Sequence, residues 1–219
     1  MKKNLILLVS AVFVVTLAAA VALTGCAKKK EVVIEELEEK AATQAKTDFK
    51  GFNVYTDRRS PNNHYIPSGW MGDYGDIKFN DMHMGNPYSG TTCIRIEQLP
   101  RRSQGAGWIG IYWQNPANNW GSRRAGFDLS GATKLTFWAR GEKGGEIIAE
   151  FKMGGITGEF SDSASAGIGP AMLTQEWKQY EIDLTGLDMS HIIGGFCLST
   201  TADDNIDGLV FYLDDIKYE

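Results

Sequence analysis

The segment KLTFWAR, residues 134–140, has the clearest β-strand pattern of this chain. Side chains alternate between the two faces of a β-strand, so Leu135, Phe137 and Ala139 share one apolar face, and Trp138 and Arg140 share the other. Similar short β-rich runs recur along the sequence between Gly, Asn, Asp and Pro punctuation, and no run has the spacing of a long amphipathic helix. The pattern predicts an all-β sandwich or barrel, with strands at 52–56, 93–98, 107–114, 125–128, 134–140, 146–153, 177–183, 195–199 and 209–218.

The overall charge of the chain argues against one class of partner. The 219 residues include 22 Lys and Arg against 27 Asp and Glu, and the formal net charge is −5. Binding to nucleic acid needs clustered positive charge, so the composition argues against a nucleic-acid partner. Apolar residues make up 43% of the chain, which is typical of a globular protein.

The N-terminus has the pattern of a targeting segment. Lys2 and Lys3 precede an apolar run over residues 5–22, and the run ends in Leu-Thr-Gly-Cys at 23–26. This ending resembles the bacterial lipobox, which implies that Cys26 is diacylated on sulfur and becomes the new N-terminus. The alternative is a single transmembrane anchor. In either case we expect an exported, membrane-tethered protein, and the Ala27 that follows implies the outer membrane if the organism has one.

The chain therefore divides into three parts. Residues 1–25 form the signal peptide, residues 26–50 a charged tether with helix propensity, and residues 51–219 one domain. The tether carries too few large apolar residues to bury a helix on a core. The domain is long enough to form a full hydrophobic core.

Three segments of this domain resemble a known family. They are FDLSGATKLTFWARG at 127–141, EWKQYEIDL at 176–184 and FYLDDI at 211–216. Their order and spacing are similar to those of the galactose-binding-like jelly-roll domains, a superfamily that includes many carbohydrate-binding modules. The resemblance implies a jelly-roll β-sandwich and favours a carbohydrate ligand, although the same fold also binds proteins and lipids.

Aromatic residues beside polar ones provide the candidate ligand site. Sugar rings stack on Trp and Tyr, and their hydroxyls bond to Asn, Gln, Asp, Glu and Arg. If Ile109 and Ile111 face the core, the alternate residues of that strand point outward, and we predict that they share a face with Trp138 and Arg140. The alternative is that these rings fill the core. The predicted ligand-binding residues are Trp108, Tyr112, Gln114, Trp120, Trp138 and Arg140.

The resemblance also implies a structural calcium ion as the cofactor. In such modules the ion joins the end of the first strand to the last strand, which suggests Asp57 and Asp214 as ligands, because oxygen donors suit a hard cation. The alternative is that both are ordinary surface carboxylates. The long segment 57–90, expected to be a loop, also holds His64 and His83, but their spacing does not suit a transition metal.

The sequence contains no enzymatic motif in the structural context that its chemistry needs. The G-x-G-x-x-G match at 105–110 opens a predicted strand and not a helix, so it lacks the context of a dinucleotide site. Asp214 and Asp215 are adjacent on a strand and are expected to point to opposite faces, unlike a glycosidase pair. A pair from distant loops, such as Asp73 with Glu159, stays open.

The sequence is therefore compatible with two functions. The first is a non-catalytic lipoprotein that captures poly- or oligosaccharide while held on the membrane through Cys26. The second is an envelope lipoprotein that uses the same sandwich as a scaffold for a protein partner. Cys93 and Cys197, both in apolar runs, are expected to be free thiols, with a disulfide as the alternative.

Overall fold

The computed structural model describes residues 32–34 and 49–219. The predicted signal peptide, the lipidation site Cys26 and nearly all of the tether lie outside the described residues. Within the described part, none of the helices has the length and apolar character needed to cross a bilayer. The chain separates into units at 1–47 and 48–219. Among the residues that the structure describes, all of the buried core belongs to the second unit, so we expect residues 48–219 to fold on their own.

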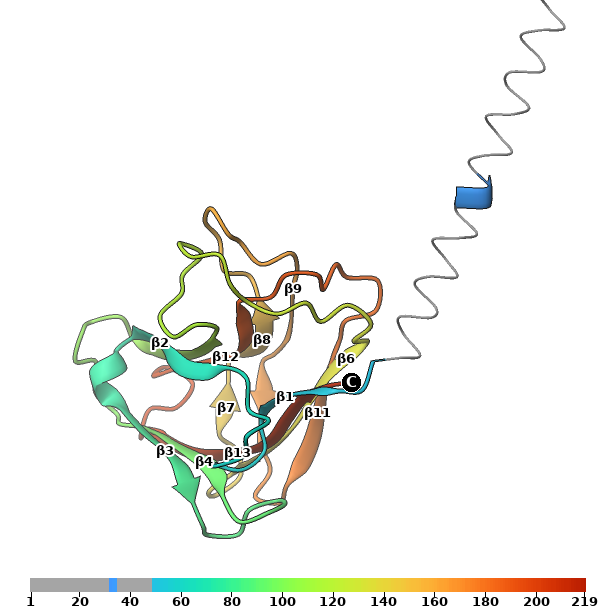
Figure 1. The fold of residues 1–219 in the computed structure, drawn as a ribbon. Helices are drawn as coiled ribbons and strands as arrows, with labels where there is room; N and C mark the ends of the chain where they lie inside the picture. The colour runs from blue at the N-terminus through green and yellow to red at the C-terminus, as the bar shows by residue number, and fades with distance from the viewer. Residues whose placement is uncertain (1–31, 35–48) are drawn as a thin grey trace, which may run out of the picture. The chain divides into compact units, whose positions relative to one another are not determined.

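The second unit is a sandwich of two antiparallel sheets, which Figure 1 shows as two layers. In sheet A the strands are, in order, β11 (Lys178–Asp183), β6 (Lys134–Gly141), β13 (Leu209–Tyr218), β4 (Cys93–Gln98) and β3 (Ile77–His83), and β1 (Phe52–Tyr55) also pairs with β13. Sheet B has the order β2 (Ile66–Gly72), β5 (Trp108–Gln114), β12 (Gly194–Thr201), β8 (Glu150–Gly154) and β9 (Ser165–Ile168). A two-stranded ladder, β7 (Ile147–Ile148) with β10 (Ala171–Met172), and a short 3₁₀ turn, η1 (Tyr74–Asp76), complete the elements.

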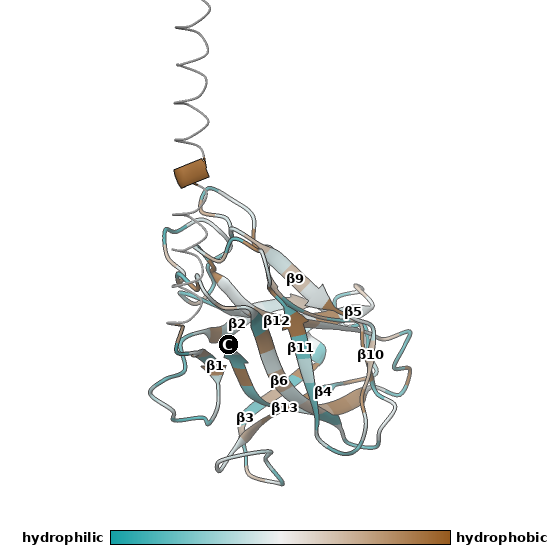
Figure 2. Cartoon of the chain, turned by 90° about the vertical axis from the view of Figure 1, so that its right-hand side faces the viewer, coloured by the Kyte–Doolittle hydropathy of each residue, from teal (hydrophilic) through white to brown (hydrophobic). Residues whose placement is uncertain are grey.

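The core fills the space between the two sheets. Phe137 on β6 packs against Phe151 on β8 and Phe196 on β12, with ring centroids 4.7 and 5.2 Å apart. Trp113 on β5 joins this cluster through Phe196, at 5.4 Å. Leu135 and Ala139 are also fully buried in it, so the apolar face predicted for β6 is confirmed. In Figure 2 the hydrophobic colour falls in patches on the strands, and the connecting loops are mostly pale or hydrophilic.

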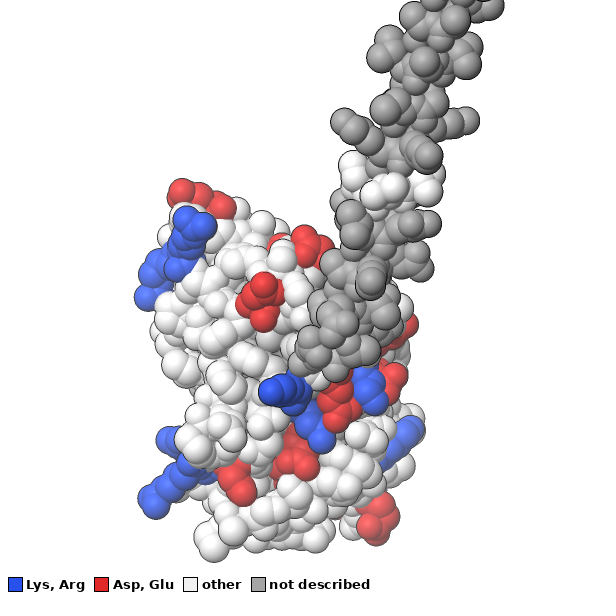
Figure 3. Space-filling view, turned by 45° about the vertical axis from the view of Figure 1, so that its right-hand side comes forward, with Lys and Arg blue, Asp and Glu red and all other residues white. Residues whose placement is uncertain are grey.

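The surface carries charges of both signs. On the face drawn in Figure 3, Lys and Arg lie in small groups close to Asp and Glu. Ion pairs of this kind include Lys134 with Glu219 and Lys217 with Glu219, both at 3.2 Å. Such exposed pairs contribute little to stability, and the mixed surface does not resemble the basic stripe of a nucleic-acid-binding protein.

Most predicted strands are confirmed, with two exceptions. Residues 125–128 form only an isolated bridge, between Phe127 and Ile192. The segment 57–90, expected to be a loop, contains β2 and β3. Both are edge strands, where Pro and Gly are tolerated because one side makes no ladder bonds. Because these segments are rich in Pro, Gly, Asn and Asp, their composition did not predict strands.

Candidate functional site

The outer face of sheet B carries the outward-pointing aromatic residues of β5, of which Trp108 is exposed and Tyr112 is buried. Trp113 and Ile111 point into the core, so Trp108, Gly110 and Tyr112 point outward, as the alternation predicts. The strand register then fixes their neighbours on the same face. Gly69 and Cys197 lie opposite Tyr112, Met71 and Ser199 lie opposite Gly110, and Thr201 lies opposite Trp108.

A glycine makes room for the ring of Trp108. A Cβ atom placed on Gly110 would lie 3.1 Å from Trp108 Cζ3 and 2.7 Å from Met71 Cε. The Trp108 ring therefore leans over the backbone of its own strand, and it remains 37% exposed. A glycine inside a strand often marks such a close approach.

Trp120 lies over sheet B in the same way. It follows β5 in the chain, the residue is 44% exposed, and its ring meets that of Tyr112 edge-on with centroids 5.8 Å apart. A Cβ atom on Gly69 would lie 2.9 Å from Trp120 Cζ2, so the ring covers this glycine of β2. Two exposed indole rings thus rest on glycines of one sheet face.

Polar side chains from β8 and β12 share this face. Lys152 lies opposite Cys197 and Glu150 lies opposite Ser199. The Lys152 ammonium is 5.9 Å from the centre of the Tyr112 ring. Hydrogen-bond donors and acceptors therefore stand next to the aromatic rings, together with the hydroxyls of Ser199 and Thr201.

Two predicted ligand contacts on β5 are buried and hold the site in place. The Tyr112 hydroxyl donates to the carbonyl of Gly154 at 2.5 Å, and burial raises its pKa well above the ordinary range. Gln114 is fully buried, accepts a bond from Ser68 and donates to the carbonyl of Asn119 at 3.0 Å. Because Asn119 immediately precedes Trp120, Gln114 positions that residue rather than contacting a ligand.

The β8–β9 loop, residues 155–164, packs beside these residues. Ile156 and Phe160 pack on the cluster that contains Tyr112. The carboxylate of Asp162 holds the loop by accepting bonds from the amides of Ile156, at 2.8 Å, and Gly194, at 3.2 Å. Burial raises the pKa of Asp162 despite these amide donors.

The predicted grouping of Trp138 and Arg140 with Tyr112 is wrong. Trp138 and Arg140 do point away from the core, but β6 belongs to sheet A, and β5 belongs to sheet B. The outer faces of the two sheets lie on opposite sides of the sandwich. The six predicted residues therefore separate into two groups.

The aromatic rings on the sheet A face are already in contact with other side chains. Tyr88 stacks on Trp138 with centroids 3.7 Å apart and an angle of 14° between the rings. The guanidinium of Arg140 lies over Tyr212, at 3.8 Å from its centre. A ligand that needs an open ring face finds it at Trp108 and Trp120 rather than at Trp138.

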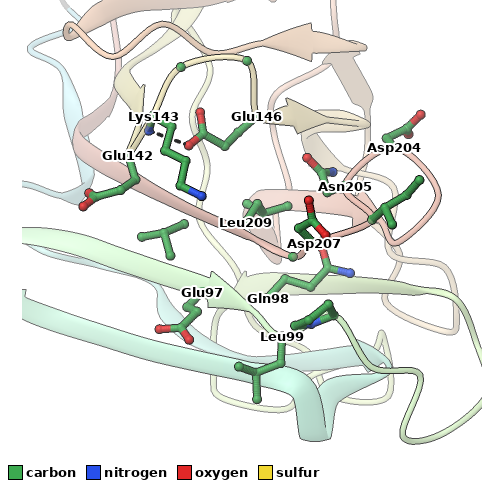
Figure 4. Close-up of a pocket in the computed structure, with 16 residues that line it drawn as sticks. Glu97, Gln98, Leu99, Glu142, Lys143, Glu146, Asp204, Asn205, Asp207 and Leu209 are labelled. Carbon is green, nitrogen blue, oxygen red and sulfur yellow. Dashed lines mark hydrogen bonds between the residues drawn. The ribbon is translucent and has the colours of Figure 1, made fainter.

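One end of the sandwich has a polar cavity, drawn in Figure 4. Its volume is about 370 Å³, and the residues that line it include no aromatic ring. Several of its carboxylates already have partners, such as Glu97 with Lys78 at 2.7 Å and Glu142 with Tyr212 at 2.5 Å. The cavity does not offer the stacking surface that sheet B offers.

Both predicted calcium ligands accept hydrogen bonds from the segment 88–92. Asp57 Oδ1 accepts bonds from the amides and hydroxyls of Thr91 and Thr92, at 2.8 to 3.1 Å. Asp214 accepts bonds from the amides of Tyr88 and Ser89. Among the described residues there is also no group of three His, Cys, Asp or Glu side chains that could hold a metal.

Removal of calcium is therefore expected to leave stability unchanged. Calcium at about 100 times its Kd would stabilise the fold by about 2.7 kcal/mol, which corresponds to a Tm shift of roughly 5–10 °C in a domain of this size. We expect the Tm of residues 48–219 to differ by less than about 1 °C between excess calcium and EDTA, as measured by calorimetry. A reproducible shift of several degrees would contradict this.

Asp214 should make stability depend on pH. Burial raises its pKa to about 7, although three amides donate to the carboxylate. Because the pKa is higher in the folded state than in the unfolded state, the contribution of Asp214 to stability is fully present below about pH 4 and is lost as the pH rises through about 7. We expect urea unfolding to show a loss of stability between about pH 4 and pH 7 that is smaller in Asp214→Asn. Asp162, whose pKa burial also raises, is unchanged in that variant; equal pH dependence in both proteins would refute the assignment to Asp214.

Asp214 and Asp215 do not alternate as expected. Asp215 has a left-handed φ of 45°, and the register of β13 with β6 shifts at this point. Both side chains consequently reach Ser89, whose amide donates to Asp214 and whose hydroxyl donates to Asp215. Asp73, the other acid considered for catalysis, accepts bonds from the amides of residues 104, 106 and 107.

Cys93 and Cys197 are both buried and unpaired, as expected from their apolar surroundings. Cys93 belongs to β4 in sheet A, and Cys197 belongs to β12 in sheet B. Burial raises the pKa of each thiol to about 12, so neither has the thiolate character of a reactive cysteine.

The sheet B face suits a ligand that has both apolar surfaces and hydroxyl groups. Trp108 and Trp120 offer ring faces for C–H groups, and the polar residues of β8 and β12 offer hydrogen bonds. Sequence reasoning identified the rings but missed Gly69, Gly110, Glu150 and Lys152. The glycines inside strand-like runs were the available signal, because they mark places where a ring approaches the backbone.

Comparison with known proteins supports the fold. No family model and no curated protein matches the chain. A crystal structure of a family 30 carbohydrate-binding module matches with a TM-score of 0.54 and 18% identity, covering 79% of this chain and 89% of that one. The family 30 carbohydrate-binding module of a cellulosomal cellulase of Clostridium thermocellum matches with a TM-score of 0.52 and 17% identity, covering 77% and 96%. The described domain therefore has the jelly-roll sandwich fold of these modules, as the sequence resemblance implied.

Proposed function

We propose that residues 51–219 bind a poly- or oligosaccharide on the outer face of sheet B. The observation that carries this proposal is the pair of exposed indole rings, Trp108 and Trp120, each resting on a glycine of the sheet. Exposed apolar surface of this kind generally marks an interaction site. The structural neighbours are named as carbohydrate-binding modules, which favours a sugar as the ligand over a protein surface.

The chemistry of a pyranose chain matches the arrangement of this face. The C–H surface of a sugar ring can stack on each indole, and the hydroxyls at its edge can bond to Glu150, Lys152 and Ser199. Because the rings come from separate positions, at the start of β5 and after its end, more than one sugar unit can be held at once. An oligosaccharide is therefore a better fit than a single sugar.

We further propose that the protein captures its ligand without catalysis. Asp73 is held by amide donors, and Asp214 lies on sheet A, away from the proposed face. Neither is placed as one of a pair of carboxylates that flank a sugar on sheet B, which glycoside hydrolysis requires.

The proposed setting is the bacterial cell envelope. The lipobox-like ending at Cys26 supports a lipid anchor, with residues 26–50 as a charged spacer between membrane and domain. An anchored sugar-binding domain would hold polysaccharide at the membrane surface. A lipid chain together with a second membrane contact is enough for stable anchoring of the protein. An outer-membrane position follows if the organism has two membranes.

A glycan array with residues 48–219 tests the proposed function. We expect retention on oligosaccharides of several units, and loss of that retention in the double variant Trp108→Ala with Trp120→Ala. Trp70→Ala is the matched control, because Trp70 is 40% exposed but points to the other side of the same sheet, against Phe79.

An array on which no glycan binds, at concentrations that detect weak binders, would contradict the proposal. Binding that survives in the double variant would contradict the assigned face. In the first case, cross-linking of the intact lipoprotein to an envelope protein through sheet B would favour the scaffold function instead.

A further inference from the structure

Arg140 is a buried cation without a counter-ion in the described part of the chain. It is 8% exposed, and none of the ion pairs among the described residues includes it. Nη1 makes a long bond to the carbonyl of Gly141, at 3.4 Å, and Nε is buried without a partner. A buried charge is costly unless an opposite charge or good hydrogen bonds compensate it.

Aromatic rings cover the faces of this guanidinium but leave an edge open. The group lies 3.8 Å from the centre of the Tyr212 ring and 5.3 Å from that of Trp177. Nη2 has no hydrogen bond among the described residues. Unlike Nε, it is not buried. The accessible part of Arg140 therefore includes N–H groups that can donate to a ligand.

The nearby carboxylates on sheet A already have partners of their own. Glu142 accepts the Tyr212 hydroxyl at 2.5 Å, and Glu97 pairs with Arg95 at 3.0 Å. Asp214 is held by the amides of the Tyr88 loop. Arg140 therefore remains available to an anion from solution.

The surroundings of Arg140 are aromatic. Tyr88, stacked on Trp138, is 41% exposed, and its ring is 6.3 Å from that of Trp177. The indole of Trp177 donates to the carbonyl of Asn86 at 3.1 Å, which fixes it beside the Tyr88 loop. An exposed ring next to a free cation suits a ligand that joins an anionic group to an apolar ring face.

We propose that Arg140 anchors a second site, on the outer face of sheet A, for the carboxylate of a uronic acid unit in an acidic oligosaccharide. The planar fork of a guanidinium matches the geometry of a carboxylate, and Tyr88 offers a surface for the attached sugar ring. This site lies on the opposite side of the sandwich from Trp108, so it does not depend on the function proposed for sheet B.

Nuclear magnetic resonance of the indole N–H groups tests this site directly. Residues 48–219 are titrated with trigalacturonate, with its methyl ester and with sodium acetate, and the signals of Trp138 and Trp177 are followed. We expect trigalacturonate to shift both signals in a saturable way, with an affinity at least about tenfold higher than that of either comparison compound. The indole signals of Trp108 and Trp120 should not shift in this titration.

Variants separate recognition from a structural role of Arg140. In Arg140→Gln we expect the saturable shift of the Trp177 signal to be lost, and in Arg140→Lys to be weakened, because Lys keeps the charge but lacks the planar fork. Arg59→Gln, at an exposed position, should behave as the parent protein. If the Gln variant does not fold, the titration of the parent protein still decides the matter.

Three results would overturn the proposal. One is the absence of any shift at Trp138 and Trp177 with trigalacturonate. Another is an equal affinity for the methyl ester, which would show that the charge is not recognised. The third is an equal affinity for acetate, which would show that the site takes a free carboxylate and not a sugar acid. Loss of neutral-glycan binding on the array would bear only on sheet B.

Discussion

Trp108→Ala is expected to weaken oligosaccharide binding by roughly 30-fold, which corresponds to about 2 kcal/mol for the loss of a central aromatic anchor. The ring supplies an open stacking face on the outer side of sheet B, and no other side chain of β5 can replace it. Stability should change little, because the ring is partly exposed and rests on glycine. Isothermal titration with the best glycan from the array measures the effect.

Trp70→Ala is again the control, since it removes an indole of similar exposure from the same sheet. Its Kd should stay close to that of the parent protein. Comparable losses in both variants would mean that affinity follows general destabilisation and not stacking at Trp108.

Trp113→Ala is expected to have the largest effect on stability. The ring is fully buried between the sheets, against Phe196 at 5.4 Å and Phe79 at 6.0 Å. Removing a buried aromatic side chain costs about 3–5 kcal/mol, because the loss of contacts is joined by the cost of a cavity. Urea unfolding of residues 48–219 should show this loss as a lower midpoint with little change in slope.

Trp138→Ala provides the comparison, because Trp138 lies outside the core and is partly exposed. We expect a smaller loss of stability, since Tyr88 loses its stacking partner but the sheets stay packed. A loss of less than about 1 kcal/mol in Trp113→Ala would contradict the placement of its ring between the sheets.

The sequence allowed prediction of the sandwich and of the face on which each side chain of a strand lies. Alternation assigned Phe137 to the core and Trp138 to the surface, and it separated Ile111 from Tyr112 in the same way. These assignments are local, because the period of a strand is set by its own backbone. They are independent of which strands pair.

Sheet membership could not be predicted in the same way. The grouping of Tyr112 with Trp138 required β5 and β6 to share a sheet, but alternation contains no information on pairing. The partner of β5 that carries the glycine under Trp120 is β2, in a segment whose Pro and Gly content indicated a loop. Pairing between distant segments is set by the packing of the whole domain.

The contacts of individual aromatic rings could not be predicted from the sequence either. Tyr88 stacks on Trp138, and its backbone amide is held there by Asp214, far along the chain. The same applies to the calcium ligands, since the donors that occupy Asp57 and Asp214 come from residues 88–92. A carboxylate near a strand end has no sequence signature that distinguishes these two environments.

The indole N–H spectrum of residues 48–219 shows directly whether neutral oligosaccharide binds to sheet B over Trp108 and Trp120. The best glycan from the array is titrated while the tryptophan signals are recorded. We expect saturable shifts of the Trp108 and Trp120 signals with a common Kd, and no saturable shift of the Trp113, Trp138 or Trp177 signals. Saturable shifts confined to Trp138 and Trp177, with the Trp108 and Trp120 signals unchanged, would place the ligand on sheet A and refute binding over Trp108 and Trp120.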